Sequence, residues 1–198
     1  MNYDTYIPTI IHYWFGDAPD FERWFNNGAT HDKDITRKFS DILRVAESGS
    51  LEYWGDSLDG FIAYIILTDQ FSRQIYRGTS AAYSNDEATL IFLEKHLNKY
   101  LTQLSAIQLL FVLMPFQHAE NVNAQKRGVN ILQALYDNET ILSEKAILKE
   151  ALHHQKGHMK VIKRFSRFPK RNEYIASRKS TKEEIKYISE TASSKLPY

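Results

Sequence analysis

Apolar side chains recur at steps of three and four residues along almost the whole chain, and this spacing constrains the fold most strongly. One example is the run of Ile35, Phe39, Ile42, Leu43 and Ala46. Such steps place apolar side chains on one face of a helix, whereas a half-buried strand needs sustained alternation at every second residue. No stretch of the sequence shows that alternation. The sequence therefore predicts an all-α fold.

Helix-breaking residues divide this pattern into about eight or nine helices. Gly16, Gly49 and Gly78 end three of them, and Pro115 ends or kinks a fourth. No low-complexity linker interrupts the 198 residues, so we expect one domain over residues 1–198. Its tail from about residue 193 is expected to fray, as chain ends commonly do.

Three helix starts carry capping signals. Ser84 with Glu87, and Ser180 with Glu183, have the spacing of capping boxes, in which each side chain bonds the other residue's backbone N–H. Thr30 is expected to cap the helix that carries Ile35 and its apolar partners.

Composition limits the chemistry and the location of the chain. Cysteine is absent, which excludes a disulfide, a thiolate metal site and a cysteine nucleophile and favours a cytoplasmic location. The longest apolar run, Phe61–Leu67, is far shorter than the roughly 20 residues that cross a bilayer. The first residues lack the basic start and the cleavage site of a signal peptide. We therefore expect no membrane association.

The segment from residue 68 to residue 78 adds charges to the end of a strongly apolar helix. Asp69 and Arg73 lie four residues apart, so they share a helical face and can form an ion pair, and Arg77 lies one turn further on. Two interpretations stay open. One is a ladder of exposed ion pairs, worth about 0.3–0.5 kcal/mol each. The other is a polar ridge that lines a pocket, which the neighbouring apolar stretch favours.

A second segment follows Pro115. A bend at the proline would present His118 and Glu120 toward a cleft, and a histidine beside a carboxylate suits acid–base chemistry. The alternative is a histidine at a helix start with an acidic first turn, which the helix dipole favours.

The third segment holds several histidines. Glu150, His154 and His158 share a helical face, which is a permissive geometry for zinc. No glutamate lies between the two histidines and lysines crowd the segment, so we expect no metal here and, instead, a histidine that donates a structural hydrogen bond. The sequence predicts no cofactor.

The fourth segment is strongly basic. Residues 156–182 hold ten basic residues and one acidic residue, a net charge of +9, while fifteen basic and twenty-three acidic residues give the rest −8. The stretch could neutralise the acidic remainder of the fold, bind a small anion, or bind nucleic acid. The whole-chain charge of +1 argues against nucleic acid.

These segments resemble those of the mostly bacterial domain of unknown function 924 family. The resemblance covers nearly the whole chain in the right order and consists of Trp14-Phe15-Gly16, residues 69–74 (DQFSRQ), residues 115–120 (PFQHAE), His158, residues 165–172 (FSRFPKRN) and residues 177–184 (SRKSTKEE). It implies antiparallel helix pairs in a superhelical bundle similar to tetratricopeptide proteins. It implies no reaction, because no activity of the family is known to us.

The sequence departs from the family pattern at several positions. Ser166 and Ser177 stand where the pattern has glycine, Lys170 where it has histidine, and Ala119 where it has serine. Ser72 and Gln74 replace a proline and an asparagine. Any family chemistry that requires a histidine at position 170 or a hydroxyl at position 119 would be missing here.

Our preferred hypothesis is a ligand-binding domain whose pocket holds a small anion, while a protein partner stays open. The expected anion-binding residues are Arg73, Arg77, Arg164, Arg167 and Arg171, supported by Asp69, Gln70 and Asn172. The alternatives are a hydrolase with His118, Glu120 and His158 as catalytic residues, and nucleic-acid binding through residues 156–182. All these hypotheses assume that helix pairing gathers the polar side chains around one hollow.

Overall fold

The computed structural model describes residues 2–26 and 28–191, and all the regular structure in that range is helical. No strand occurs among these residues, which confirms the prediction of an all-α fold. The chain divides into two compact units, Met1–Pro115 and Phe116–Tyr198. That the two form a single domain stays a prediction. The expected frayed tail lies outside the described residues.

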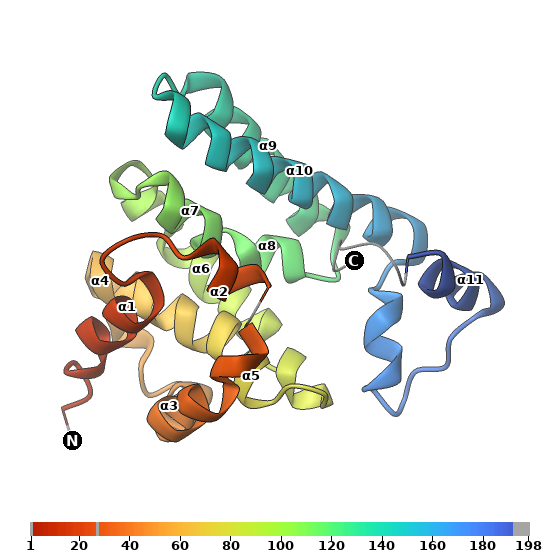
Figure 1. Cartoon of the computed structure of the whole chain (residues 1–198), viewed down its shortest axis with the longest axis horizontal. Coiled ribbons are helices and arrows are strands. Elements are labelled where there is room, and N and C mark those ends of the chain that lie inside the picture. The colour runs from red at the N-terminus through yellow and green to blue at the C-terminus, as the bar shows by residue number, and fades with distance from the viewer. Residues whose placement is uncertain (1, 27, 192–198) are drawn as a thin grey trace. The chain divides into compact units, whose positions relative to one another are not determined.

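The first unit is built from short helical segments, coloured red to green in Figure 1. They are α1 (Tyr6–Phe15), α2 (Phe21–Phe25), η1 (Gly28–His31), α3 (Asp32–Glu47), η2 (Glu52–Asp56), α4 (Leu58–Ile65), η3 (Ile66–Phe71), α5 (Ser72–Ile75), η4 (Ser80–Tyr83), α6 (Asp86–Tyr100), η5 (Leu101–Gln103) and α7 (Ala106–Val112). A short helix, α8 (Met114–His118), spans the boundary between the units.

Aromatic rings fill the core of the first unit. Phe39 of α3 stacks on Phe71 of η3 with ring centroids 4.6 Å apart. Trp14 of α1 meets Phe111 of α7 edge-on at 5.2 Å. Such rings bury large apolar areas and pack in these two geometries. They join α3 to η3 and α1 to α7. Helix α1 also packs against α4, and α3 against α5.

Segment η3 is a π-helix that continues α4 without a break. A π-helix has a wider turn than an α-helix and occurs most often as a single turn at functional sites. Here it carries Thr68, Asp69 and Gln70. This wider turn could not be predicted, because the apolar spacing before and after it is that of an ordinary helix.

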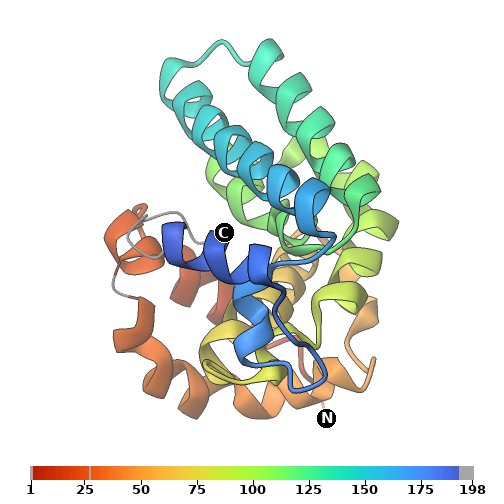
Figure 2. The same cartoon turned by 90° about the vertical axis from the view of Figure 1, so that its right-hand side faces the viewer.

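The second unit is organised by α9 (Val122–Asn138) and α10 (Leu142–Phe165), which lie side by side in both views (Figures 1 and 2). The short connection between them makes the pair antiparallel. Gly128 permits their close approach, because a Cβ atom there would lie 2.8 Å from Oε1 of Gln155. Segments η6 (Pro169–Glu173) and α11 (Lys182–Thr191) follow.

The longest helix, α10, has 24 residues and continues unbroken through Gly157. Among the described residues, no helix, α10 included, combines the length and the apolar character that a membrane span needs.

Two helices begin at other residues than predicted. Helix α6 begins at Asp86, and the Ser84 hydroxyl instead donates to the carbonyl of Ala81 at 2.8 Å. Helix α3 is preceded by the one-turn helix η1, so its cap position falls on His31 rather than on Thr30. In both places an extra helical turn before the main helix moves the start along the chain.

The capping box predicted at Ser180 and Glu183 is wrong by one residue. Thr181 and Glu184 form it instead: the Thr181 N–H donates to Oε2 of Glu184 at 2.7 Å, and the Glu184 N–H donates to Oγ1 of Thr181 at 3.2 Å. Both pairs have the same spacing and equally good cap residues, so the sequence alone does not distinguish them.

Helix α10 ends at Ser166, whose φ of 58° is left-handed. No other non-glycine residue in the described ranges has a positive φ. Glycine takes this conformation at helix ends without steric cost, whereas a side chain is crowded by the following carbonyl. The family pattern that the chain resembles has glycine at this position, so Ser166 carries backbone strain that the pattern avoids.

We predict that Ser166→Gly raises the free energy of unfolding by about 1 kcal/mol, because it removes this crowding. Ser177→Gly is the matched control, since Ser177 also replaces a glycine of the pattern but has no positive φ. There the more flexible glycine should lower stability by about 0.5–1 kcal/mol. Urea unfolding followed by circular dichroism measures both, and equal effects of the two substitutions would contradict the assignment of strain.

Candidate functional site

A buried carboxylate, Asp69, organises the predicted polar segment of the first unit. Its side chain is fully buried, and the Arg73 guanidinium lies 3.2 Å from its Oδ1. Arg73 also pairs with Asp86 at 2.6 Å and donates to the carbonyl of Ala82 at 3.0 Å. Gln70 donates to the other Asp69 oxygen at 2.5 Å. The predicted pair of Asp69 and Arg73 is therefore confirmed, and it is buried rather than an exposed ladder.

The two predicted arginines of the first unit, Arg73 and Arg77, bind carboxylates of the same unit. Burial would lower the pKa of Arg73, but the charges of Asp86 and Asp69 outweigh it and raise that pKa above its ordinary value. Arg77 makes a two-pronged contact with Asp32, at 2.5 and 2.9 Å. Both guanidiniums tie helical segments together.

In the second unit, the carboxylate of Glu120 also binds arginine. Arg178 donates to its two oxygens at 2.9 and 2.5 Å, and the backbone N–H of Phe168 donates to Oε1 at 2.8 Å. Arg171 lies 3.9 Å away. Burial would raise the pKa of Glu120, but these hydrogen bonds and charges lower it below its ordinary value.

His158 lies on α10, and its side chain is buried next to Phe168. Its Nδ1 lies 2.8 Å from the carbonyl oxygen of Gln117, which fits a donated N–H. Its ring lies 5.3 Å from the ring of Phe168 and 6.2 Å from that of His118. Burial is the main cause that lowers the pKa of His158 to about 3. The ring is therefore neutral at physiological pH, and the expected structural hydrogen bond is present.

Arg171 joins these residues into one cluster. Its guanidinium lies 4.6 Å from the centroid of the Phe168 ring, and one of its nitrogens donates to the carbonyl of His118 at 2.9 Å. We call the set the Glu120 cluster; its members are His118, Glu120, His158, Phe168, Arg171 and Arg178. Four predicted site residues of the second unit thus come together here, whereas Phe168 and Arg178 were not among the predictions.

The other predicted residues of the second unit contact different partners. Arg164 binds Glu183 at 2.8–2.9 Å, and Arg167 binds Glu184 at 2.7 and 2.9 Å. Asn172 is buried and donates to the hydroxyl of Ser180 at 3.1 Å. The contacts of both arginines support the interpretation that the basic stretch neutralises acidic groups of the fold.

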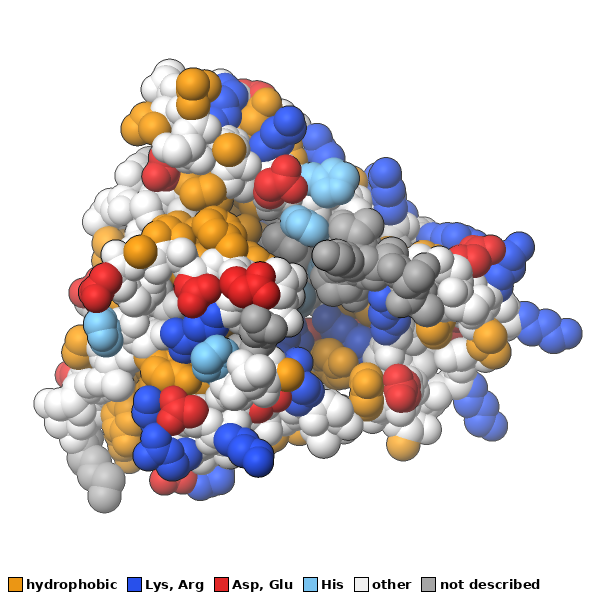
Figure 3. Space-filling model, viewed as in Figure 1, with side chains coloured by type: hydrophobic (Ala, Val, Ile, Leu, Met, Phe, Trp, Pro, Cys, Tyr) orange, Lys and Arg blue, Asp and Glu red, His pale blue; other side chains and the backbone are white. Residues whose placement is uncertain are grey.

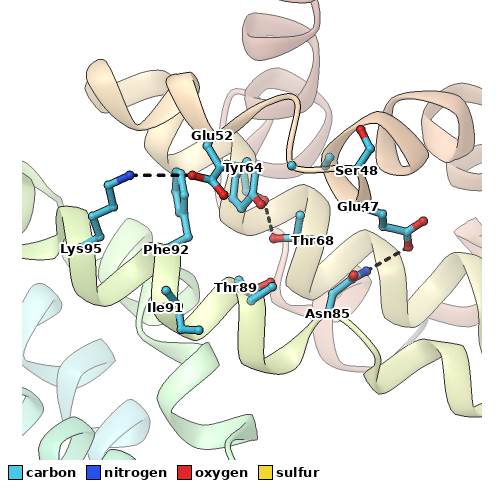
Figure 4. Close-up of a pocket in the computed structure, with 13 residues that line it drawn as sticks. Glu47, Ser48, Glu52, Tyr64, Thr68, Asn85, Thr89, Ile91, Phe92 and Lys95 are labelled. Atoms are coloured by element: carbon cyan, nitrogen blue, oxygen red, sulfur yellow. Dashed lines mark hydrogen bonds and ion pairs between the residues drawn. The ribbon is translucent and has the colours of Figure 1, made fainter.

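The sequence did not predict a pocket of about 400 Å³ in the first unit (Figure 4). The end of α3, η2, α4, η3 and α6 each contribute residues to it, and none is a predicted site residue. No sequence signal marks it, because each element supplies only one to six ordinary residues. Within residues 2–26 and 28–191, no group of three or more His, Asp or Glu side chains is arranged to hold a metal ion.

Comparisons with known proteins agree with the fold. A family model described as a bacterial protein of unknown function, DUF924, matches residues 10–192. Among solved structures, the chain is similar to a protein of unknown function from Agrobacterium tumefaciens, with a TM-score of 0.82 and 28% identity over 96% of this chain and 99% of that chain. No curated protein matches.

The low pKa of His158 predicts how stability depends on pH. The unfolded histidine binds a proton near pH 6.5 and the folded one near pH 3, so the unfolded state holds more protons between these values. Stability should therefore fall as pH drops below about 6.5, by up to about 1.4 kcal/mol per pH unit. His158→Gln, whose amide can still donate to Gln117, should flatten this slope.

Urea unfolding at pH 7, 6 and 5 measures the slope before most carboxylates titrate. His153→Gln is the matched control, because His153 is exposed on the same helix. Its slope should equal that of the unsubstituted chain. A His158→Gln slope as steep as this control would show that His158 is not the group responsible.

Proposed function

The chain belongs to this family of bacterial proteins of unknown function, and from its own geometry we propose that the second unit binds a small anion at the Glu120 cluster. The observation that carries the proposal is the convergence of two guanidiniums on one carboxylate. Arg171 and Arg178 both lie within 4 Å of the single carboxylate of Glu120. Among the described ion pairs of Glu120 there are thus two guanidiniums for one carboxylate.

The charge of the whole second unit favours the same ligand. Residues 116–198 contain sixteen basic and nine acidic residues, a net charge of +7. Figure 3 shows Lys and Arg side chains on the surface of this unit. A field of one sign raises the local concentration of oppositely charged ligands and speeds their association.

Guanidinium chemistry defines the class of anion. The planar fork of donors on an arginine matches a carboxylate or a phosphate group, and Arg178 already binds the Glu120 carboxylate in this way. Arg171 is held by the ring of Phe168 and by the carbonyl of His118, so its orientation is set in advance. We therefore assign it the main role in binding. Arg73, Arg77, Arg164 and Arg167 each form an ion pair of 3.2 Å or less with a carboxylate of the chain, which leaves them less suited to a small anion.

The same contacts rank the alternatives. Arg164 and Arg167 bind Glu183 and Glu184, which weakens the case for nucleic acid on the basic stretch. For a hydrolase, the low pKa of His158 makes that ring a weak base at neutral pH, so His118 would carry the acid–base role. No described contact favours the hydrolase over simple binding.

The proposal also covers the architecture of the protein and its location in the cell. We extend the antiparallel pair of α9 and α10 to a tetratricopeptide-like stacking of helix pairs, as the family resemblance implies. We also propose a cytoplasmic location, which the absence of cysteine favours.

We predict that inorganic phosphate stabilises the protein against thermal unfolding more than chloride does at equal ionic strength. Arg171→Gln should weaken phosphate binding about tenfold or more, because a charged hydrogen bond contributes about 1.5–3 kcal/mol. Isothermal titration calorimetry at constant ionic strength measures the affinity of each variant.

Arg164→Gln is the control, since it removes the same charge from an exposed position in the same unit. Its phosphate affinity should stay within about twofold of the unsubstituted chain. Equal weakening in both variants would instead indicate a diffuse basic surface of the kind that nucleic acid binds, and would end the proposal of a defined anion site.

A further inference from the structure

The carboxylate of Glu120 makes the contacts that a bound anion would make. Its Oε1 accepts from Arg178 at 2.9 Å and from the backbone N–H of Phe168 at 2.8 Å. Its Oε2 accepts from Arg178 at 2.5 Å. An arginine fork and a backbone N–H are also the donors that proteins offer to carboxylate and phosphate ligands. Glu120 therefore binds to the cluster as an external ligand would.

The pair of Glu120 and Arg178 is within reach of solvent. The side chain of Glu120 is 17% exposed and that of Arg178 is 25% exposed. Among the described hydrogen bonds and ion pairs, Arg178 binds only Glu120, and the N–H of Phe168 donates only to the same carboxylate. Without the charge of Glu120, both donors would need another acceptor.

Guanidiniums surround this carboxylate from several segments. Arg171 of η6 lies 3.9 Å from it. Arg167 follows α10, and its pKa is raised by its hydrogen bond to Glu184 and, to a smaller extent, by the charge of Glu120. Glu184 binds Arg167 at 2.7 Å, so it is already matched. Glu120 is therefore the carboxylate that an anion at Arg171 and Arg178 must compete with.

Two histidines are the other titratable side chains of the cluster. Burial is the main cause that lowers the pKa of His158 to about 3, so this ring stays neutral above pH 5. His118 precedes Glu120 by two residues, and its backbone carbonyl, not its ring, accepts from Arg171. A pH effect on anion binding must therefore be assigned to either Glu120 or His118.

An anion and the carboxylate of Glu120 compete for the same donors, because two like charges on one arginine fork repel each other. We propose that Glu120 is an internal competitor of the anion: it holds Arg178 and the N–H of Phe168 in the free protein, and it takes up a proton from solvent when an anion replaces it. This inference rests on the proposed anion site and adds its regulation, since the site favours anions in acid.

The direction of the pH effect follows from the donors of Glu120. In the free protein, burial raises its pKa, but the hydrogen bonds from Arg178 and Phe168 and the charge of Arg171 lower it below its ordinary value. A bound anion withdraws these donors and adds a negative charge, and both changes raise the pKa. The complex then holds more protons than the free protein, so anion binding strengthens as pH falls.

Isothermal titration calorimetry with sulfate at pH 7 and constant ionic strength tests the competition. Glu120→Gln keeps the size of the side chain and an acceptor oxygen but removes the charge, so it should bind sulfate at least about tenfold more tightly than the unsubstituted chain. Glu173→Gln is the matched control, because it removes an exposed carboxylate from η6, two residues from Arg171. It should change the affinity less than about twofold.

The outcomes separate this inference from the anion site itself. Sulfate binding that Arg171→Gln weakens, but that Glu120→Gln does not strengthen, would keep the anion site and overturn the competition. Equal gains in Glu120→Gln and Glu173→Gln would overturn it as well, since they would reflect net charge alone. No sulfate binding in any variant would overturn both proposals.

The same titration at pH 5 tests the proton, because sulfate keeps its charge between pH 5 and pH 7. The unsubstituted chain should bind sulfate several-fold more tightly at pH 5 than at pH 7. Glu120→Gln should lose most of this difference, whereas His118→Gln should retain it. The reverse result would assign the proton to His118 and contradict the role of Glu120.

Glu120→Ala gives a second test that does not depend on how glutamine fits the cluster. Acetate reproduces the lost carboxylate, so it should raise the thermal unfolding midpoint of this variant more than that of the unsubstituted chain. Acetamide has the same shape without the charge and should raise neither. Equal effects of acetate on the two proteins would show that no external anion replaces Glu120.

Discussion

A carboxylate that leaves water, wholly like Asp69 or partly like Glu120, must be matched by cations and hydrogen-bond donors. The desolvation of an unpaired charge costs far more than a typical domain can supply. Asp69 is matched by Arg73 and Gln70, and through Arg73 it is tied to the start of α6. Glu120 is matched by Arg178 and by the backbone of Phe168. Both carboxylates therefore bind together segments that are distant in the sequence.

This requirement explains which parts of the site could be predicted. The pair of Asp69 and Arg73 is local, and four-residue spacing alone places both side chains on one helical face. The partners of Glu120 lie 48 to 58 residues further along the chain. Helix periodicity carries no information about which distant arginine will reach a given carboxylate. Arg178 was accordingly counted only as one of ten basic residues.

The same reasoning applies to the anion-binding predictions and to the pocket. Arg164 and Arg167 looked available because the stretch around them is basic, yet Glu183 and Glu184 lie on the following helix and engage both. The helices themselves were predictable, since apolar spacing and breaking residues act within a few residues. The pocket was not, because it depends on how five elements that are distant in the sequence pack together.

The total charge of the chain is near neutral, but its two units carry net charges of opposite sign. Fifteen acidic against nine basic residues in the first unit, and nine against sixteen in the second, leave net charges of −6 and +7. The ion pairs around Asp69 and Glu120 cancel only part of the charge of each unit, and the rest resides on other side chains. Such an excess attracts ligands of opposite sign but is screened over about 10 Å at 0.1 M salt. Selectivity among those ligands must therefore come from groups held in fixed positions, such as the guanidinium of Arg171 over the ring of Phe168.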